Sequence, residues 1–317
     1  MQPIELLESR FLLSASLSNG TLRVNGTSGS DVISISLRNH KYTVKINSTT
    51  STFSPSAVRS LTVRGNAGND KITLSGPIKA RTTVNGDDGD DTIQGSAGSE
   101  QIVGGAGRDL LRGGNGDDTI RGGDGDDSIF GEAGDDSLFG DTGDDKILGG
   151  ADDDFIDGHR GNDDLNGGDG ADTINGGEDD DTLHGGDGPD LLNGDNGDDE
   201  LFGGDDNDGL NGGEGNDYLD GGPSNDFLQG GRDDDTLFDH DGHDTLVGGE
   251  GDDDLDAHDG NPDDTLDVRL GQDQFRADAF DDVIEQPQEQ QEPNCVFIFG
   301  LLSCNPIPDN SGLVVIT

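Results

Sequence analysis

The chain has few of the residues from which a hydrophobic core is normally built. Across 317 residues it contains no tryptophan, one methionine and 4% aromatic residues, and only 28% of its residues are hydrophobic. Globular domains usually contain about 45–50% apolar residues, so an ordinary buried core is not expected. The longest apolar run, residues 296–302, is far shorter than the roughly 20 residues of a membrane helix, so no transmembrane segment is expected either.

Positive charge is also scarce. The chain carries 18 Lys and Arg residues against 69 Asp and Glu residues, a formal net charge of −51 at pH 7. Residues 1–85 have a balance of +6, whereas residues 86–317 have a balance of −57. So acidic a chain repels nucleic-acid phosphates, which excludes nucleic-acid binding as a main role and favours cations as partners. Low hydrophobicity with high net charge also keeps a chain disordered unless the charge is neutralised.

Residues and motifs typical of catalysis are missing. Zinc-protease, nucleophile-elbow, phosphate-loop and EF-hand motifs do not occur, so we expect no enzyme and assign no catalytic or organic-cofactor residue. Cys295 and Cys304, the two cysteines, fit a local disulfide in an oxidising compartment. Regularly spaced His or Cys ligands are absent, which argues against zinc or copper. His240, His243 and His258 are interpreted as surface histidines rather than a transition-metal site.

What the chain has instead is a nine-residue repeat that runs without insertion or deletion over residues 86–256. Among its nineteen units, position 1 is Gly except at Asp239, position 6 is Asp except at Glu100, and position 8 is always Ile or Leu. Fixed periodicity indicates stacked repeats. We expect glycines at positions 1, 2 and 4 to take positive φ in a turn, and the last three residues to form a very short strand. Two units then make an 18-residue coil, and the stack is an all-β solenoid with two parallel sheets enclosing the Ile and Leu side chains.

In such a stack each turn lies over the turn two units away, so the position-6 carboxylates form ladders of like charge. A hard cation between them, held by carboxylates and main-chain carbonyls, converts repulsion into attraction. Calcium accepts about 6–8 oxygen ligands in flexible geometry, whereas magnesium requires an octahedron. The array allows at most about 17 inter-turn calcium sites, which would change the balance of residues 86–256 from −47 to −13. The predicted metal ligands are Asp91, Asp109, Asp118, Asp127, Asp136, Asp145, Asp154, Asp163, Asp172, Asp181, Asp190, Asp199, Asp208, Asp217, Asp226, Asp235, Asp244 and Asp253.

The units GGNGDDTIR (113–121) and GGDGDDSIF (122–130) match the nonapeptide G-G-x-G-x-D-x-U-x, and the chain resembles the hemolysin-type, or RTX, calcium-binding repeat proteins. The resemblance implies a right-handed parallel β-roll that binds calcium between turns through the position-6 Asp and turn carbonyls. It also implies a secreted protein that is unfolded in the low-calcium cell and folds outside. Position 4 departs from Gly at Asp152, Asp179, Asp206, Asp233 and Ser224, and Glu100 puts its own site in doubt.

Six segments are predicted along the chain. They are an N-terminal sorting-like segment (1–20), a β-rich N-terminal cap with two degenerate repeats (21–85), the calcium-binding β-roll (86–256), degenerate repeats with a C-terminal cap (257–285), a polar linker (286–294), and an apolar tail with a possible disulfide (295–317). Residues 6–14 resemble the LEPR-XLL motif of secreted or surface bacterial proteins, with Ser9 in place of Pro; a short amphipathic helix is the alternative. Residues 21–85 are alternatively an independent β-domain, and the tail is either an end cap or an export signal.

The array loses its regularity near its C-terminal end. The register slips by two residues at Ala257 and His258, and three weaker units follow, which place Asp264, Asp273 and Asp282 at position 6. Their glycines are mostly lost, as expected for the atypical terminal repeats of a solenoid.

Taken together, these features predict a secreted, extracellular or cell-surface bacterial protein whose roll folds on calcium and acts as a structural, surface or adhesion element. The alternatives are a non-catalytic accessory or remnant of a larger RTX-type enzyme or toxin, and a disordered acidic calcium buffer. The unbroken Ile and Leu ladder argues against the buffer. A cell-surface or matrix partner is compatible with the sequence, which does not identify it.

Overall fold

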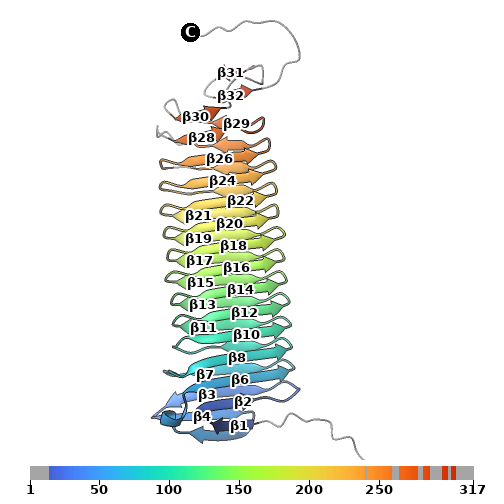
Figure 1. Ribbon diagram of the computed structural model, residues 1–317, viewed down its shortest axis with the longest axis vertical. Coiled ribbons are helices and arrows are strands. Elements are labelled where there is room, and N and C mark those ends of the chain that lie inside the picture. Colours follow the sequence, from blue (N-terminus) through green and yellow to red (C-terminus); the bar gives the residue numbers. More distant parts are fainter. Residues whose placement is uncertain are drawn as a thin grey trace, which may run out of the picture.

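The chain forms a tall stack of coils (Figure 1). The computed structural model describes residues 14–239, 241–258, 264–277 and 281–285, and the backbone of the strands at 295–298 and 301–304. Most of the sorting-like segment, His240 and the polar linker lie outside the described residues. Over the described part the one helix is the short η1 (Pro55–Ala57), and no helix is long and apolar enough to cross a bilayer.

Successive strands alternate between two sheets that face each other across the stack. The first sheet contains, in spatial order, β1 (Ser14–Ser18), β2 (Thr21–Asn25), β6 (Ser60–Ala67), β8 (Arg81–Asp88), β10 (Glu100–Ala106), β12 (Thr119–Asp124), β14 (Ser137–Thr142), β16 (Phe155–Arg160), β18 (Thr173–Glu178), β20 (Leu191–Asn196), β22 (Gly209–Glu214), β24 (Phe227–Arg232), β26 (Thr245–Glu250), β28 (Thr265–Val268) and β30 (Asp282–Glu285). The second contains β5 (Thr49–Phe53), β4 (Lys41–Ile46), β3 (Val32–Arg38), β7 (Lys71–Ser75), β9 (Thr92–Gln94), β11 (Leu110–Asn115), β13 (Ser128–Ala133), β15 (Lys146–Ala151), β17 (Asp164–Asp169), β19 (Thr182–Asp187), β21 (Glu200–Asp205), β23 (Tyr218–Asp220), β25 (Thr236–Phe238), β27 (Asp254–Asp256), β29 (Gln274–Arg276), β32 (Leu301–Cys304) and β31 (Cys295–Ile298).

Strands of the regular array pair in parallel, and each residue lies beside its equivalent two repeat units further along the chain. In the first sheet Ile102 lies beside Ile120, and Ile120 beside Leu138. The second sheet repeats the pattern, with Leu111 beside Ile129. The predicted coil of two units and the β-solenoid fold are therefore confirmed.

The strands are longer than the sequence predicted. Most strands of the array have six residues rather than three: β12 runs from position 7 of one unit through position 3 of the next. The prediction was wrong because it treated the glycines as part of the turn. Their backbones instead continue the ladder, as Gly123 does when it pairs with Asp141. Glycine has little intrinsic strand preference, so the stacking imposes this conformation.

The core is a single file of aliphatic side chains from each sheet. Every position-8 residue from Ile93 to Leu255 is at most 1% exposed. Burying one such side chain contributes about 1.5–3 kcal/mol, whereas ordering the backbone costs about 1–2 kcal/mol for each of the nine residues in a unit. Hydrophobic burial alone therefore falls well short of what ordering each unit requires.

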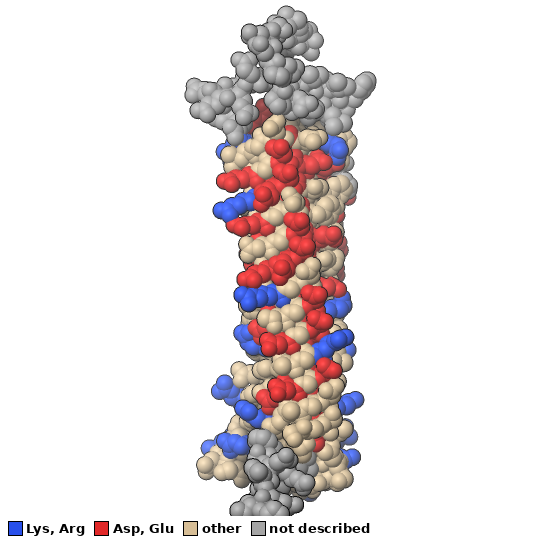
Figure 2. Space-filling view, turned by 90° about the vertical axis from the view of Figure 1, so that its right-hand side faces the viewer, with Lys and Arg blue, Asp and Glu red and all other residues tan. Residues whose placement is uncertain are grey.

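The segments that precede the regular array build the lowest coils of the same stack. The antiparallel hairpin of β1 and β2 covers the end of the first sheet, and β3, β4 and β5 form an antiparallel meander at the end of the second. Parallel pairing begins with β2 on β6 and β3 on β7. Their buried side chains belong to the same core cluster as those of the array. Acidic side chains run along the roll in Figure 2, whereas its N-terminal end carries Lys and Arg with few acids.

The irregular C-terminal coils absorb the predicted register slip. Leu246 pairs with Leu266, so this coil is longer than a regular one, as expected from the slip at Ala257 and His258. The next coil is shorter than a regular one and places Thr265 beside Asp282, so Asp282 occupies position 7 rather than the predicted position 6. Beyond this point β32 pairs antiparallel with β29, and Cys295 lies opposite Cys304 in the β31–β32 hairpin.

Candidate metal sites between the coils

Most of the turns that carry the acidic residues have positive φ at positions 2 and 4. Gly123 and Gly125, at these positions of one unit, both have φ of +122°. The aspartates that replace Gly at position 4 adopt the same region, with φ of +77° at Asp152 and +71° at Asp233. Asp tolerates this region better than most residues, so these departures preserve the turn.

Glycine is required at position 1 for a different reason, namely the lack of space for a side chain. Contrary to expectation, it does not take positive φ in the array; what it lacks is room for a side chain. A Cβ on Gly122 would lie 2.2 Å from Oδ2 of Asp127 and 2.7 Å from the carbonyl oxygen of Gly140. A carboxylate oxygen and a main-chain carbonyl from two stacked turns thus converge on one small space beside most of these glycines.

Hydrogen bonds hold the position-6 aspartates in this orientation. Oδ1 of Asp127 accepts a hydrogen bond from the backbone N–H of Asp109 at 2.7 Å. The N–H of Asp127 in turn donates to Oδ1 of Asp145, also at 2.7 Å. Repeated through the stack, this contact makes two columns of aspartates, one at the start of each sheet's strands. All eighteen predicted ligands lie in these columns and are at most 5% exposed.

The second carboxylate oxygen of nearly every predicted ligand has no hydrogen-bond partner within the described part of the chain. These buried Oδ2 atoms belong to Asp91, Asp109, Asp118, Asp127, Asp136, Asp145, Asp154, Asp163, Asp172, Asp181, Asp190, Asp199, Asp208, Asp217, Asp226, Asp235 and Asp253. Burial of a carboxylate oxygen without a partner is costly. A regular row of such atoms indicates that a ligand outside the chain satisfies them.

Burial shifts the protonation of the columns. Loss of solvation raises the pKa of Asp118 to about 8, that of Asp127 to about 7 and that of Asp109 to about 6. The backbone hydrogen bond to each carboxylate opposes the rise, and neighbouring carboxylates add to it. The folded columns therefore bind protons near neutral pH unless a cation takes their place.

The donor set fits a hard cation. The atoms nearest to the space beside Gly122 are Oδ2 and Cγ of Asp127 and the carbonyl oxygen of Gly140, so the converging donors are oxygens. Oxygen donors are the ligands of calcium and magnesium, and the forgiving geometry of calcium suits a site assembled from two separate turns.

Glu100 does not present the same free oxygen. Its longer side chain folds back onto Ser96, whose N–H donates to Oε2 at 2.8 Å and whose hydroxyl donates to Oε1 at 2.9 Å. The doubt raised by this departure is therefore justified, because both oxygens are engaged inside the unit.

The second-sheet column extends beyond the regular array. Asp70, from the degenerate repeat at 65–73, has a buried Oδ2 without a partner among the described residues, and so does Asp273. Asp31, from the repeat at 26–34, differs: Thr27 donates to its Oδ2 and Asn47 to its Oδ1. At the other end of the first-sheet column Asp281, not Asp282, accepts the hydrogen bond from Asp264. The degenerate nonads were the sequence signal for Asp70 and Asp273.

Sequence reasoning missed one acidic residue altogether. Asp239, treated only as an exception at position 1, is fully buried, and its Oδ2 points at the space beside Gly221. One oxygen from each of Asp226, Asp239 and Asp244 lies within 4.8 Å of the others. The signal available was the exception itself, an acid in a position otherwise reserved for Gly.

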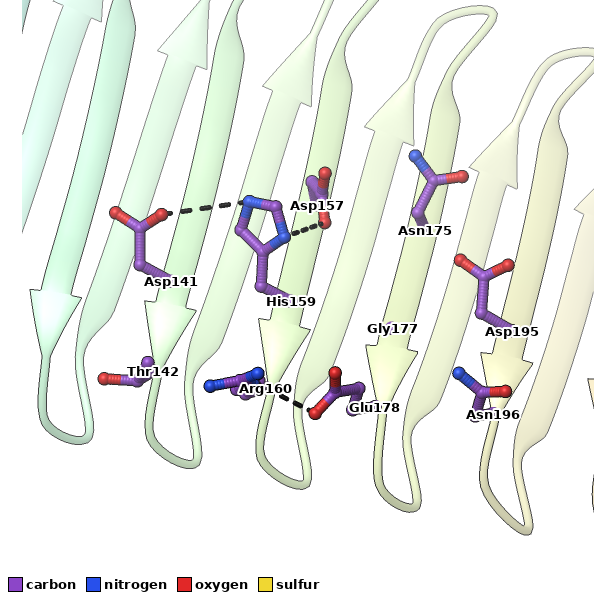
Figure 3. A pocket seen from close by; sticks show the side chains of 10 residues that line it. All are labelled: Asp141, Thr142, Asp157, His159, Arg160, Asn175, Gly177, Glu178, Asp195 and Asn196. Atoms are coloured by element: carbon purple, nitrogen blue, oxygen red, sulfur yellow. Dashed lines mark hydrogen bonds and ion pairs between the residues drawn. The ribbon is translucent and has the colours of Figure 1, made fainter.

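A separate polar pocket lies on the outer face of the first sheet, across β14, β16, β18 and β20 (Figure 3). There His159 lies between Asp141 and Asp157, with nitrogen-to-oxygen distances of 3.8 and 3.2 Å, and Arg160 donates to Glu178 at 3.0 Å. The two carboxylates lie on opposite sides of the imidazole ring, so the three groups do not converge on one point. The contacts of His159 with Asp141 and of Arg160 with Glu178 join neighbouring coils on the outer surface, whereas that of His159 with Asp157 lies within β16.

Comparison with known families gives one finding. A sequence model of the RTX calcium-binding nonapeptide repeat, in four copies, matches residues 81–111, 103–138, 112–147, 139–174, 175–210, 202–237 and 229–262. These matches together span more than half of the chain. A comparison with curated proteins gives no match.

Proposed function

Because the chain belongs to the family of RTX calcium-binding nonapeptide repeat proteins, we propose that calcium ions between its coils supply the stability that its thin core lacks, so that the roll folds where calcium is plentiful. The observation that carries this proposal is the row of buried Oδ2 atoms without hydrogen-bond partners in the described chain. Calcium binding and folding are then one process, because the ligands come together only when two turns stack.

The ligands proposed are the eighteen position-6 aspartates of the array. Each would hold its ion through Oδ2, with help from a position-1 carbonyl such as that of Gly140, while Oδ1 keeps its backbone hydrogen bond to the preceding coil. The ion neutralises carboxylates that otherwise repel one another across the stack. Residues 21–85 and the C-terminal coils would then serve as caps at the two ends of the roll.

We infer a structural role outside the cell. Extracellular calcium modules commonly bind at about 10⁻⁴–10⁻³ M, a range in which the roll would be folded outside a cell and unfolded inside. The family membership and the net charge of −51 support this interpretation. The described residues consist of the repeat array and the β-segments stacked at its two ends, which favours a non-catalytic surface, matrix or adhesion element. A non-catalytic accessory to a larger secreted protein is the second candidate, since the roll would serve as a folding module in either case.

Far-UV circular dichroism through a calcium titration tests the proposal. We expect a cooperative change from coil to β-structure near millimolar calcium, and no such change with magnesium at the same concentrations. A chain that is already folded in excess chelator at neutral pH would contradict the proposal. A chain that binds calcium but stays disordered would instead support an acidic calcium buffer.

A further inference from the structure

One inter-turn site differs from all others in its ligands. Within the part of the chain that the structure describes, Asp226, Asp239 and Asp244 form the one group of three acidic or histidine residues whose ligand atoms lie within 4.8 Å of one another. Asp226 and Asp244 are the usual position-6 residues of two stacked turns. Asp239 is additional, because it stands where the other eighteen units have glycine.

The carboxylate of Asp239 takes the place of a main-chain carbonyl. In the coil below, the space beside Gly203 is lined by Oδ2 of Asp208 and the carbonyl oxygen of Gly221, each 2.5 Å from where a Cβ would stand. Beside Gly221 the corresponding atoms are Oδ2 of Asp226 at 2.8 Å and Oδ2 of Asp239 at 2.2 Å. A charged oxygen has therefore replaced a neutral one at the same point in the repeat.

An orphaned oxygen points into this cluster. Asp226 is 3% exposed, its Oδ1 accepts the backbone hydrogen bond of Asp208, and its Oδ2 has no partner among the described residues. Because Oδ2 of Asp226 faces the same small space as Oδ2 of Asp239, a cation in that space would contact both oxygens.

The backbone around the cluster is also less regular. The three second-sheet strands nearest to the cluster are β23, β25 and β27. Each has three residues, whereas most strands of the array have six. They end at position 9, and beyond β25 the N–H of Asp239 still donates to the carbonyl oxygen of Asp256 at 3.0 Å, but the strand does not continue through positions 2 and 3. The two-residue register slip follows within one coil. This turn therefore receives less support from the sheet than others do.

We propose that Asp226, Asp239 and Asp244 form a three-carboxylate calcium site that binds its ion more tightly than the regular inter-turn sites and releases it last when calcium is withdrawn. The proposal rests on the calcium-binding role proposed above. Affinity for calcium rises with the number of charged ligands, and this site has one carboxylate more than its neighbours. The retained ion fastens the irregular C-terminal coils to the regular array.

The test measures calcium bound per chain by equilibrium dialysis against buffers of fixed free calcium, with the full chain. In the wild type we expect one ion to remain bound at free calcium about tenfold or more below the concentration that empties the other sites. Partial retention is physically reasonable because coils of a solenoid contact only their neighbours, so a few can stay folded around one ion.

The decisive variant is Asp239→Asn, which keeps the shape and one oxygen but removes the charge. We expect this variant to lose the tightly held ion and to release all its calcium over a single range of free calcium concentration. The matched control is Asp234→Asn, which should keep the tight ion. Asp234 is an exposed aspartate in the preceding repeat unit, and its Oδ1 accepts a hydrogen bond that Asn can also accept. If Asp239→Asn fails to fold in saturating calcium, Asp239→Gly, which restores the regular unit, takes its place with the same expectation.

Two results overturn the proposal. One is a wild-type binding curve in which all ions are released over the same range of free calcium. The other is a tightly bound ion that is still retained in Asp239→Asn or Asp239→Gly. Either leaves the general calcium-binding role intact, because the remaining ions would still bind and fold the roll. A wild-type chain that binds no calcium at all would instead refute the proposed function.

Discussion

Acid should replace calcium in stabilising this roll, and the effect has a defined pH range. Burial raises the pKa of Asp127 from 3.8 to about 7 and that of Asp118 to about 8. An aspartate whose folded-state pKa is raised contributes stability that is fully present below its unfolded pKa and is lost as the pH rises through its folded pKa. In chelator, the roll should therefore lose stability progressively from about pH 4, near the unfolded pKa, to about pH 8, the highest of these folded pKa values.

The size of the effect follows from the shifts. One pKa unit corresponds to about 1.4 kcal/mol, so a rise from 3.8 to about 7 amounts to about 4 kcal/mol for Asp127 alone. Even if ionisation of each carboxylate lowers the stability of the roll by only about 1 kcal/mol, the seventeen ligand carboxylates with a partnerless Oδ2 would together lower it by more than the roughly 5–15 kcal/mol by which domains are usually stable. The calcium-free roll should thus be unfolded at pH 8 and substantially ordered near pH 5.5.

The assay is far-UV circular dichroism in chelator from pH 8.5 to pH 5. Asp118→Asn, neutral at every pH and still able to accept through Oδ1, should move the transition to higher pH. Asn at the exposed neighbour Asp117 should move it less, because the charge of Asp117 is the weakest of the contributions that raise the pKa of Asp118. Ordinary aspartates titrate near pH 3.9. Ordering that begins only below about pH 4.5 would therefore assign the effect to general surface neutralisation and refute the reasoning from the buried columns.

Two further substitutions test the core and the metal site separately. Leu165→Ala, at a core position that is 0% exposed, should lower the free energy of unfolding in saturating calcium by about 2–5 kcal/mol, as measured by denaturant titration; the partly exposed Leu148→Ala is the control, and equal effects would argue against a single-file core. Gly122→Ala would place a methyl group 2.2 Å from Oδ2 of Asp127 and should remove about one calcium ion per chain, counted by equilibrium dialysis, whereas Ser128→Ala should remove none. An unchanged count in Gly122→Ala would mean that the space beside position 1 is not where the ion lies.

Sequence periodicity was sufficient for the parts of the structure that repeat. A spacing of nine with Ile or Leu at position 8 predicts which side chains are buried, and doubling it predicts that Asp109 stacks on Asp127. The length of the strands was not predictable in this way, because glycine backbones such as that of Gly123 join the ladder only through the neighbouring coils.

Departures from the repeat were harder to predict. Asp281 rather than Asp282 joins the column because one coil is a residue shorter, and no glycines remain there to fix the frame. Asp239 was counted as a defect, since the role of a position-1 residue depends on which atoms face it across the stack. The sequence identifies such an exception, but packing decides whether it disrupts a site or adds a ligand to it.

The ends of the second-sheet column are chemically different, and this difference gives the array a starting point. Asp31 has its oxygens satisfied by Thr27 and Asn47, so the first layer needs no ion, whereas the layers above it present open carboxylates. Within the array every coil is nearly interchangeable with the next, and a chain that looped out one whole coil would recover almost the same contacts. Identical coils therefore do not determine by their own contacts which coil stacks on which. Residues 21–85, whose sequence differs from that of the array, would therefore fix where the first regular coil stacks, since parallel pairing begins with β2 on β6 and β3 on β7.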